Sequence, residues 1–120
     1  MERFSFGDSP ELADELLALV LAGAKTATSW AADEGLKGVE VGKRWTVTDG
    51  AGKPRAIIET TEVAKHLFTE VDESIAYDEG EGDRTLAYWR KAHTDYFTRL
   101  GQFAPRMELY CERFKLIEIL

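Results

Sequence analysis

The chain has 120 residues, of which 44% are hydrophobic and 31% charged, so it can form one domain with one hydrophobic core. Its 15 Lys and Arg against 22 Asp and Glu give a net charge of −7. This charge argues against DNA or any long nucleic-acid backbone as a partner, because such binding depends on basic side chains. No bilayer-spanning apolar run and no leader segment are evident, and the single cysteine suits a reducing compartment, so we expect a cytoplasmic protein without a membrane partner.

The first element in chain order is predicted to be an amphipathic helix over residues 10–22. Ser9 is a typical N-cap, and Pro10 suits the first helical position, where no amide hydrogen is needed. Apolar residues follow at every fourth position: Leu12, Leu16 and Val20. Gly23 ends the helix, because the left-handed turn after a helix favours glycine.

The middle of the chain is predicted to form antiparallel strands. Residues 31–42 are polar and indicate a loop with one helical turn near its start. Strand formers dominate residues 44–48 and 55–63, and the glycine-containing turn at 49–54 joins them as a hairpin. A further short strand is expected at 64–68.

The second half adds helices and then strands. We expect a short helix at 71–77, an acidic glycine loop at 78–83, and a helix from a Thr85 cap to Leu100. Residues 107–120 indicate one or two closing strands. The order helix, strands, helices, strands predicts an α+β fold, in which a small curled sheet or barrel is flanked by helices.

One candidate site follows the first helix, in the sequence Gly-Ala-Lys-Thr-Ala-Thr-Ser-Trp at residues 23–30. A desolvated lysine can take the proton of a threonine hydroxyl and so make a nucleophile. Alternatively, Lys25 simply faces the negative end of the helix dipole. Spacing alone favours this second interpretation.

The other candidate residues are acidic, imidazole and thiol groups. Glu79 and Glu81 lie on the predicted glycine-bracketed loop, where they could reach a cleft and carry protons or simply remain solvated. His93 shares a helix face with aromatic residues, which indicates a core histidine or a proton carrier at a pocket edge. Cys111 lies among apolar strand residues and is expected to be a buried hydrophobe. No metal-binding spacing or cofactor motif is present, so we expect neither a metal nor a cofactor.

Several of these features, taken together, resemble the ASCH domain family. The first is Gly23-x-Lys25-Thr26-x-Thr28 directly after the first helix. The second is Tyr-Asp-Glu-Gly-Glu-Gly-Asp at 77–83, which leads into Leu-x-x-Trp-Arg-x-x-His at 86–93. The resemblance covers nearly the whole chain as a single domain, 1–120, and is to a longer bacterial branch often described as RNA-binding proteins. It implies a small PUA-like β-barrel, antiparallel or mixed, flanked by helices.

The resemblance also implies chemistry. Some small members of the family are amidohydrolases that remove the acyl group of 4-N-acetylcytidine with a lysine, a threonine and a glutamate. The first two correspond to Lys25 and Thr28, and the glutamate to Glu79, with Glu81 as its competitor. The implied function is hydrolysis of an N-acylated cytosine nucleoside by a Lys-activated Thr nucleophile with a Glu proton shuttle. The alternatives are a module that binds a modified nucleoside or short single-stranded RNA without chemistry, and a metal-independent ribonuclease.

The chain departs from the amidohydrolase signature at one position. The small enzymes have an arginine two residues after the threonine, where this chain has Trp30. Trp30 could stack on a base or belong to the core. Thr26 and Ser29 are further candidates, as donors to the oxyanion of the intermediate. The sequence leaves the oligomeric state open.

Overall fold

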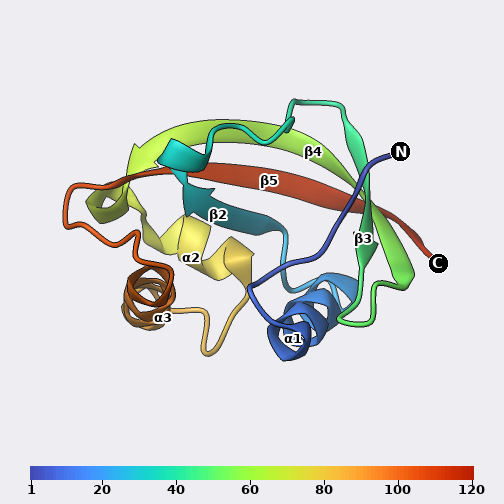
Figure 1. The fold of residues 1–120 in the computed structure, drawn as a ribbon, viewed down its shortest axis with the longest axis horizontal. Coiled ribbons are helices and arrows are strands. Elements are labelled where there is room, and N and C mark those ends of the chain that lie inside the picture. Colours follow the sequence, from blue (N-terminus) through green and yellow to red (C-terminus); the bar gives the residue numbers. More distant parts are fainter.

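The computed structural model describes residues 1–120 and has an α+β architecture, in which the helices lie together below a five-stranded sheet in the view of Figure 1. The elements, in chain order, are β1 (Arg3–Phe4), α1 (Pro10–Leu21), β2 (Ala27–Ala31), β3 (Arg44–Thr48), β4 (Pro54–Leu67), α2 (Glu73–Glu79), α3 (Leu86–Arg99) and β5 (Glu108–Ile119), with short 3-10 turns at Ala32–Glu34 and Phe68–Glu70. None of the helices is both long and apolar enough to cross a membrane.

The sheet is mixed, with the strand order β1-β3-β4-β5-β2. β1 runs parallel to β3, and the other pairs are antiparallel. The long pair β4 and β5 carries register shifts at Ile57/Ile58 and Thr60/Glu62, and such bulges bend strands. The two edge strands, β1 and β2, do not pair with each other, so the sheet is open and not a closed barrel. The predicted α+β class is confirmed.

Most predicted elements are present, and the differences have physical causes. The first helix has its Ser9 cap, whose side chain accepts from the Leu12 amide at 3.1 Å. The two strands expected at 55–68 are one continuous strand, β4, because β5 pairs with it from Ala56 to Leu67. No strand was expected between residues 23 and 31, but β2 (Ala27–Ala31) forms there because it pairs with β5.

A second correction concerns Glu79, which was expected on a loop. It is the last residue of α2, a helix that starts later than predicted because Asp72 caps it by accepting from the Ile75 amide at 3.0 Å. Gly80 then ends the helix with a φ of 75° in the left-handed region. The Glu79 side chain is therefore held by a helix and not by a flexible turn.

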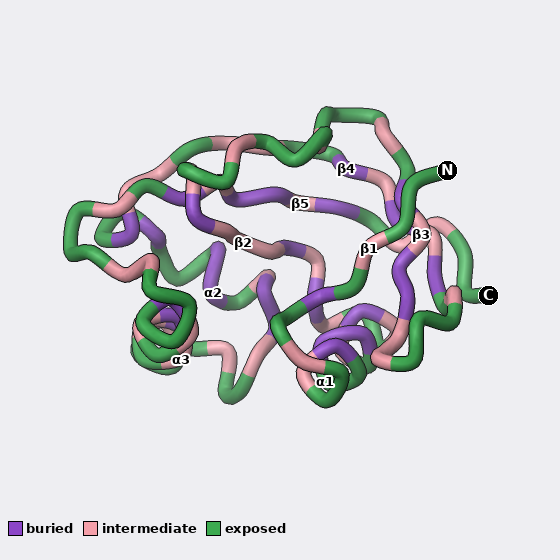
Figure 2. The backbone as a smooth tube through the Cα atoms, in the orientation of Figure 1, coloured by how far each residue is buried: buried purple, intermediate pink, exposed green.

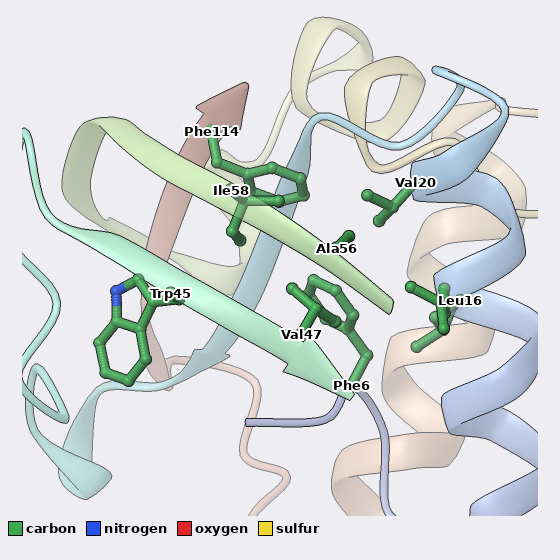
Figure 3. Packing of buried hydrophobic residues seen from close by; sticks show 9 residues of the cluster. Phe6, Leu16, Val20, Trp45, Val47, Ala56, Ile58 and Phe114 are labelled. Carbon is green, nitrogen blue, oxygen red and sulfur yellow. The ribbon is translucent and has the colours of Figure 1, made fainter. Parts of the chain in front are cut away.

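Two hydrophobic clusters lie between the helices and the sheet. The first packs α1 against β3, β4 and β5, where Leu16 and Val20 face Val47 and Ala56 (Figure 3). The second packs α2 and α3 against the far end of β5 and β2. Figure 2 shows that buried residues recur along the strands and helices, whereas the segment between β2 and β3 is largely exposed. The candidate site lies between the two clusters.

Candidate functional site

Lys25 is fixed at the junction between α1 and β2. After the turn at Gly23, whose φ is 80°, the Lys25 amide bonds to the Leu19 carbonyl at 3.1 Å. The next amide, of Thr26, donates to the Asp78 carbonyl near the end of α2 at 2.7 Å. These bonds turn the Lys25 side chain inward, and only 2% of the residue is exposed.

The Lys25 ammonium lies among oxygen atoms supplied by the end of α2. Its Nζ donates to the Glu79 carbonyl and to Glu81 Oε2, both at 3.3 Å, and lies 3.8 Å from Glu79 Oε1. The Phe6 ring covers it with a centroid distance of 5.5 Å. A buried charge is stable only when it is paired and hydrogen-bonded. Lys25 is therefore a buried, paired cation and not a solvated side chain.

The Glu79 carboxylate is the most highly connected group of the site. Its Oε2 accepts from the Ser29 hydroxyl and from the Trp89 indole N–H, both at 2.7 Å, and its Oε1 lies 3.3 Å from His93 Nε2. Burial opposes ionisation, but the charges of His93 and Lys25 and the hydrogen bonds outweigh it, so the pKa of Glu79 falls to about 2. Glu79 is thus a fixed anion.

His93 is a partner of Glu79 on α3. Its Nδ1 lies 2.9 Å from the Trp89 carbonyl, and its ring stacks on the Trp89 indole with a centroid distance of 4.1 Å. Burial would lower the pKa of His93, but the Glu79 carboxylate outweighs this effect and raises it. Both ring nitrogens face acceptors, which suits the doubly protonated imidazolium.

Two adjoining cavities lie beside the charged residues Lys25, Glu79 and His93. The charged cavity, of about 130 Å³, is lined by Lys25, Thr28, Glu79, Glu81 and His93 together with apolar residues of α1 and α3. The aromatic cavity, of about 280 Å³, is lined by Phe4, Phe6, Trp30, Trp45 and Tyr96, with Thr28 and Glu112. Thr28 lines both cavities, and no hydrogen bond in the structure engages its hydroxyl. A planar ring in the aromatic cavity would therefore lie beside a free hydroxyl.

The remaining sequence candidates divide between the site and its support. Thr26 lines neither cavity, and its hydroxyl lies 3.4 Å from the Asp78 carbonyl. Ser29 lines both cavities, but its hydroxyl is bonded to Glu79. Trp30 forms a wall of the aromatic cavity and donates its indole N–H to the Gly35 carbonyl at 2.7 Å. Cys111 is buried, and burial raises the pKa of its thiol to about 11.

Glu112 and Trp45 are among the residues of the aromatic cavity that sequence reasoning missed. Glu112 lies on β5 opposite Thr28 and is 4% exposed. Its burial raises the pKa of the carboxyl, and the Thr60 hydroxyl donates to its Oε2 at 2.6 Å. The Trp45 indole nitrogen is buried without a partner. Glu112 alternates along β5 with Tyr110, Phe114 and Leu116, and a glutamate in this largely apolar series was the signal that could have indicated it.

Glu79, Glu81 and His93 also form the donor set that a metal ion would need, since their ligand atoms lie within 4.8 Å of one another. However, the Lys25 ammonium is already paired with both carboxylates, at 3.3 Å from Glu81 and 3.8 Å from Glu79. A divalent cation placed there would be repelled by this charge. The cluster therefore fits its own lysine better than a metal.

This chain is similar to a known protein family and to solved structures. A family model described as the ASCH domain matches residues 2–118. A crystal structure of an ASCH domain from Lactobacillus crispatus JV V101 is 35% identical with a TM-score of 0.87, covering 96% of this chain and 78% of that one. A protein from Enterococcus faecalis V583 is also 35% identical with a TM-score of 0.88, covering 99% and 77%. A hypothetical protein at 11% identity and a TM-score of 0.64, covering 87% and 93%, shares the fold alone. No curated protein matches the chain.

Proposed function

This chain belongs to the ASCH domain family, and from that premise we propose that it is an amidohydrolase that removes the acyl group from N-acylated cytosine nucleosides of the 4-N-acetylcytidine type. The observation that carries the proposal is the placement of a buried lysine, a free threonine hydroxyl and a carboxylate around one cavity. The adjoining aromatic cavity has the flat apolar walls that a nucleobase requires.

In the proposed reaction, Thr28 is the nucleophile and Lys25 the base. Lys25 first passes a proton to Glu81, whose Oε2 is 3.3 Å from Nζ, and the neutral amine then takes the proton of the Thr28 hydroxyl. The Thr28 oxygen attacks the acyl carbon and gives a tetrahedral oxyanion. The bond from carbon to the exocyclic nitrogen breaks as that nitrogen takes the proton held by Glu81. Water then attacks the Thr28 ester and gives a proton to the Glu81 carboxylate, while Lys25 returns a proton to the Thr28 oxygen and acetate is released.

The two glutamates have different roles in this proposal. Glu79 is fully buried, has a pKa of about 2 and is bonded to three side chains besides Lys25. A group in this state holds its partners in place and does not exchange protons near neutral pH. The Glu81 side chain is 21% exposed and contacts Lys25. We therefore assign proton transfer to Glu81 and the positioning of Lys25 to Glu79.

The test is release of cytidine from 4-N-acetylcytidine, measured by chromatography. We expect the wild-type protein to release cytidine. Thr28→Val and Lys25→Met should each lower this turnover at least about 10³-fold, because the nucleophile and its base act together. Thr98→Val and Lys91→Met are matched controls, since both residues are exposed on α3. A wild-type rate equal to that of the buffer blank would refute the proposal.

A separate pair of variants tests the roles of the glutamates. Glu81→Gln is expected to lower kcat by about 10²-fold or more and to lower the free energy of unfolding less than Glu79→Gln does, because Glu81 is partly exposed and contacts only Lys25 among the charged groups. Glu79→Gln is expected to destabilise the fold as well. Wild-type kcat in Glu81→Gln would show that proton transfer does not pass through this residue.

The aromatic cavity also supports a second candidate, binding of single-stranded RNA without chemistry. Its tryptophans and phenylalanines could stack on an unpaired base. This candidate predicts saturable binding of a short RNA that weakens with salt, with no product from 4-N-acetylcytidine. The net charge of −7 favours the enzyme, because a backbone-binding surface needs basic residues. RNA cleavage that persists in a chelator and is lost in Lys25→Met would instead identify a ribonuclease.

A further inference from the structure

Glu112 occupies a position that neither the family signature nor the proposed reaction explains. It pairs with Thr28 across β2 and β5, and directly opposite residues of antiparallel strands have Cβ atoms about 5 Å apart on the same face. Both side chains line the aromatic cavity. The carboxyl group therefore lies beside the hydroxyl that attacks in the proposed reaction.

The Glu112 carboxyl is buried and only half satisfied. Its Oε2 accepts from Thr60 at 2.6 Å, but no hydrogen bond in the structure reaches its Oε1. The residue is 4% exposed, but Oε1 is not fully enclosed by protein, so this oxygen remains accessible to a ligand. Trp45, which lines the same cavity, also has a buried indole N–H without a partner. Unpaired polar groups around an apolar cavity indicate a ligand with polar edges and flat faces.

We propose that Glu112 Oε1 accepts a hydrogen bond from the exocyclic N–H of a nucleobase held in the aromatic cavity, and that this contact selects cytosine-type bases over uracil. The choice of ligand rests on the proposed function, because attack by Thr28 on the acyl carbon places the exocyclic nitrogen beside the Thr28–Glu112 pair. Uracil carries an acceptor oxygen at the position of that N–H. Two acceptors would then face each other in a buried site, which is unfavourable.

Equilibrium binding of cytidine and uridine at pH 8 tests the inference directly, since neither nucleoside carries an acyl group. We expect the wild-type protein to bind cytidine at least about tenfold more tightly than uridine. In Glu112→Gln the new amide N–H can donate to the uracil oxygen, so the cytidine preference should fall at least about fivefold. Glu118→Gln makes the same chemical change at an exposed position of β5 and should keep the wild-type preference.

Equal affinity of wild-type protein for the two nucleosides, binding of neither, or an unchanged preference in Glu112→Gln would overturn the inference. If Glu112→Gln does not fold, 4-N,N-dimethylcytidine replaces it in the test, because this ligand lacks the exocyclic N–H; affinity equal to that of cytidine would then overturn the inference. The proposed function is tested separately. Cytidine selectivity without turnover of 4-N-acetylcytidine would refute the amidohydrolase and support the role of Glu112. Turnover without cytidine selectivity would support the amidohydrolase and refute the role of Glu112.

Discussion

Replacing Glu79 by glutamine is expected to destabilise the fold more than any exposed Glu→Gln change. The amide keeps the shape of the side chain, and its oxygen can still accept from Ser29 or Trp89. It removes the negative charge that faces Lys25 at 3.8 Å and His93 at 3.3 Å. Breaking a buried ion pair from one side leaves the other charge without compensation, which typically costs about 3–5 kcal/mol.

The pKa of Glu79 gives a second measure of the same effect. The value is about 2 in the folded protein and 4.5 ordinarily, and this difference corresponds to about 3 kcal/mol of stability at neutral pH. For a chain of 120 residues, a loss of about 3 kcal/mol lowers Tm by about 12 °C. The variant should therefore lose a large part of a typical stability of about 5–15 kcal/mol.

The pH dependence has a defined sign. A carboxyl with a lowered folded pKa stabilises the fold above 4.5, and this contribution disappears as the pH falls toward 2. His93 has a raised pKa, so its contribution is complete below 6.5 and disappears as the pH rises through the folded value. The interaction of these two residues is therefore strongest between pH 4.5 and 6.5. Glu79→Gln should flatten both sides of this profile.

Urea unfolding of the wild type and the variant between pH 3 and pH 9 is the assay. Glu73→Gln, on the exposed side of α2, is the matched control. If the unfolding free energy of Glu79→Gln lies within about 1 kcal/mol of that of the control and the wild-type pH profile is kept, the Glu79 carboxylate does not stabilise Lys25 and His93 as argued.

Three further predictions concern the surroundings of the site. Gly80→Ala places a Cβ 2.5 Å from the Ala24 carbonyl oxygen. Urea unfolding should therefore show a loss of unfolding free energy well above the roughly 1 kcal/mol expected for Gly52→Ala, where the φ is as positive but no atom lies within 4 Å of the added Cβ. Equal losses in the two variants would contradict this prediction. Cys111, buried with a pKa of about 11, should react with a chromogenic disulfide at pH 8 at least about 100-fold more slowly in the folded protein than in urea; equal rates would refute its burial. Trp30→Phe removes one hydrogen bond and should lower the free energy of unfolding by about 1 kcal/mol, and a neutral result would show that the indole N–H contributes nothing.

Local sequence signals were enough for elements whose boundaries depend on neighbouring residues. The caps Ser9 and Thr85 and the turn between β3 and β4 were predicted correctly, because side-chain capping and turn geometry act over a few positions. The α+β class followed from the order of these elements. Strand β2 was missed because five residues after a turn carry little periodicity, and pairing with β5 decides their conformation.

For the site, the sequence indicated which residue types are present, whereas the fold determines their burial and charge pairing. The motif around Lys25 and the acidic stretch at 77–83 were visible in the sequence. That Glu79 is a buried helix residue bonded to His93, whereas Glu81 remains partly exposed, depends on the packing of α2 against α3 and β2. Glu112 lies opposite Thr28 only because two strands far apart in the chain pair in one register. Burial and charge pairing arise from such long-range contacts, so only the tertiary structure could decide them.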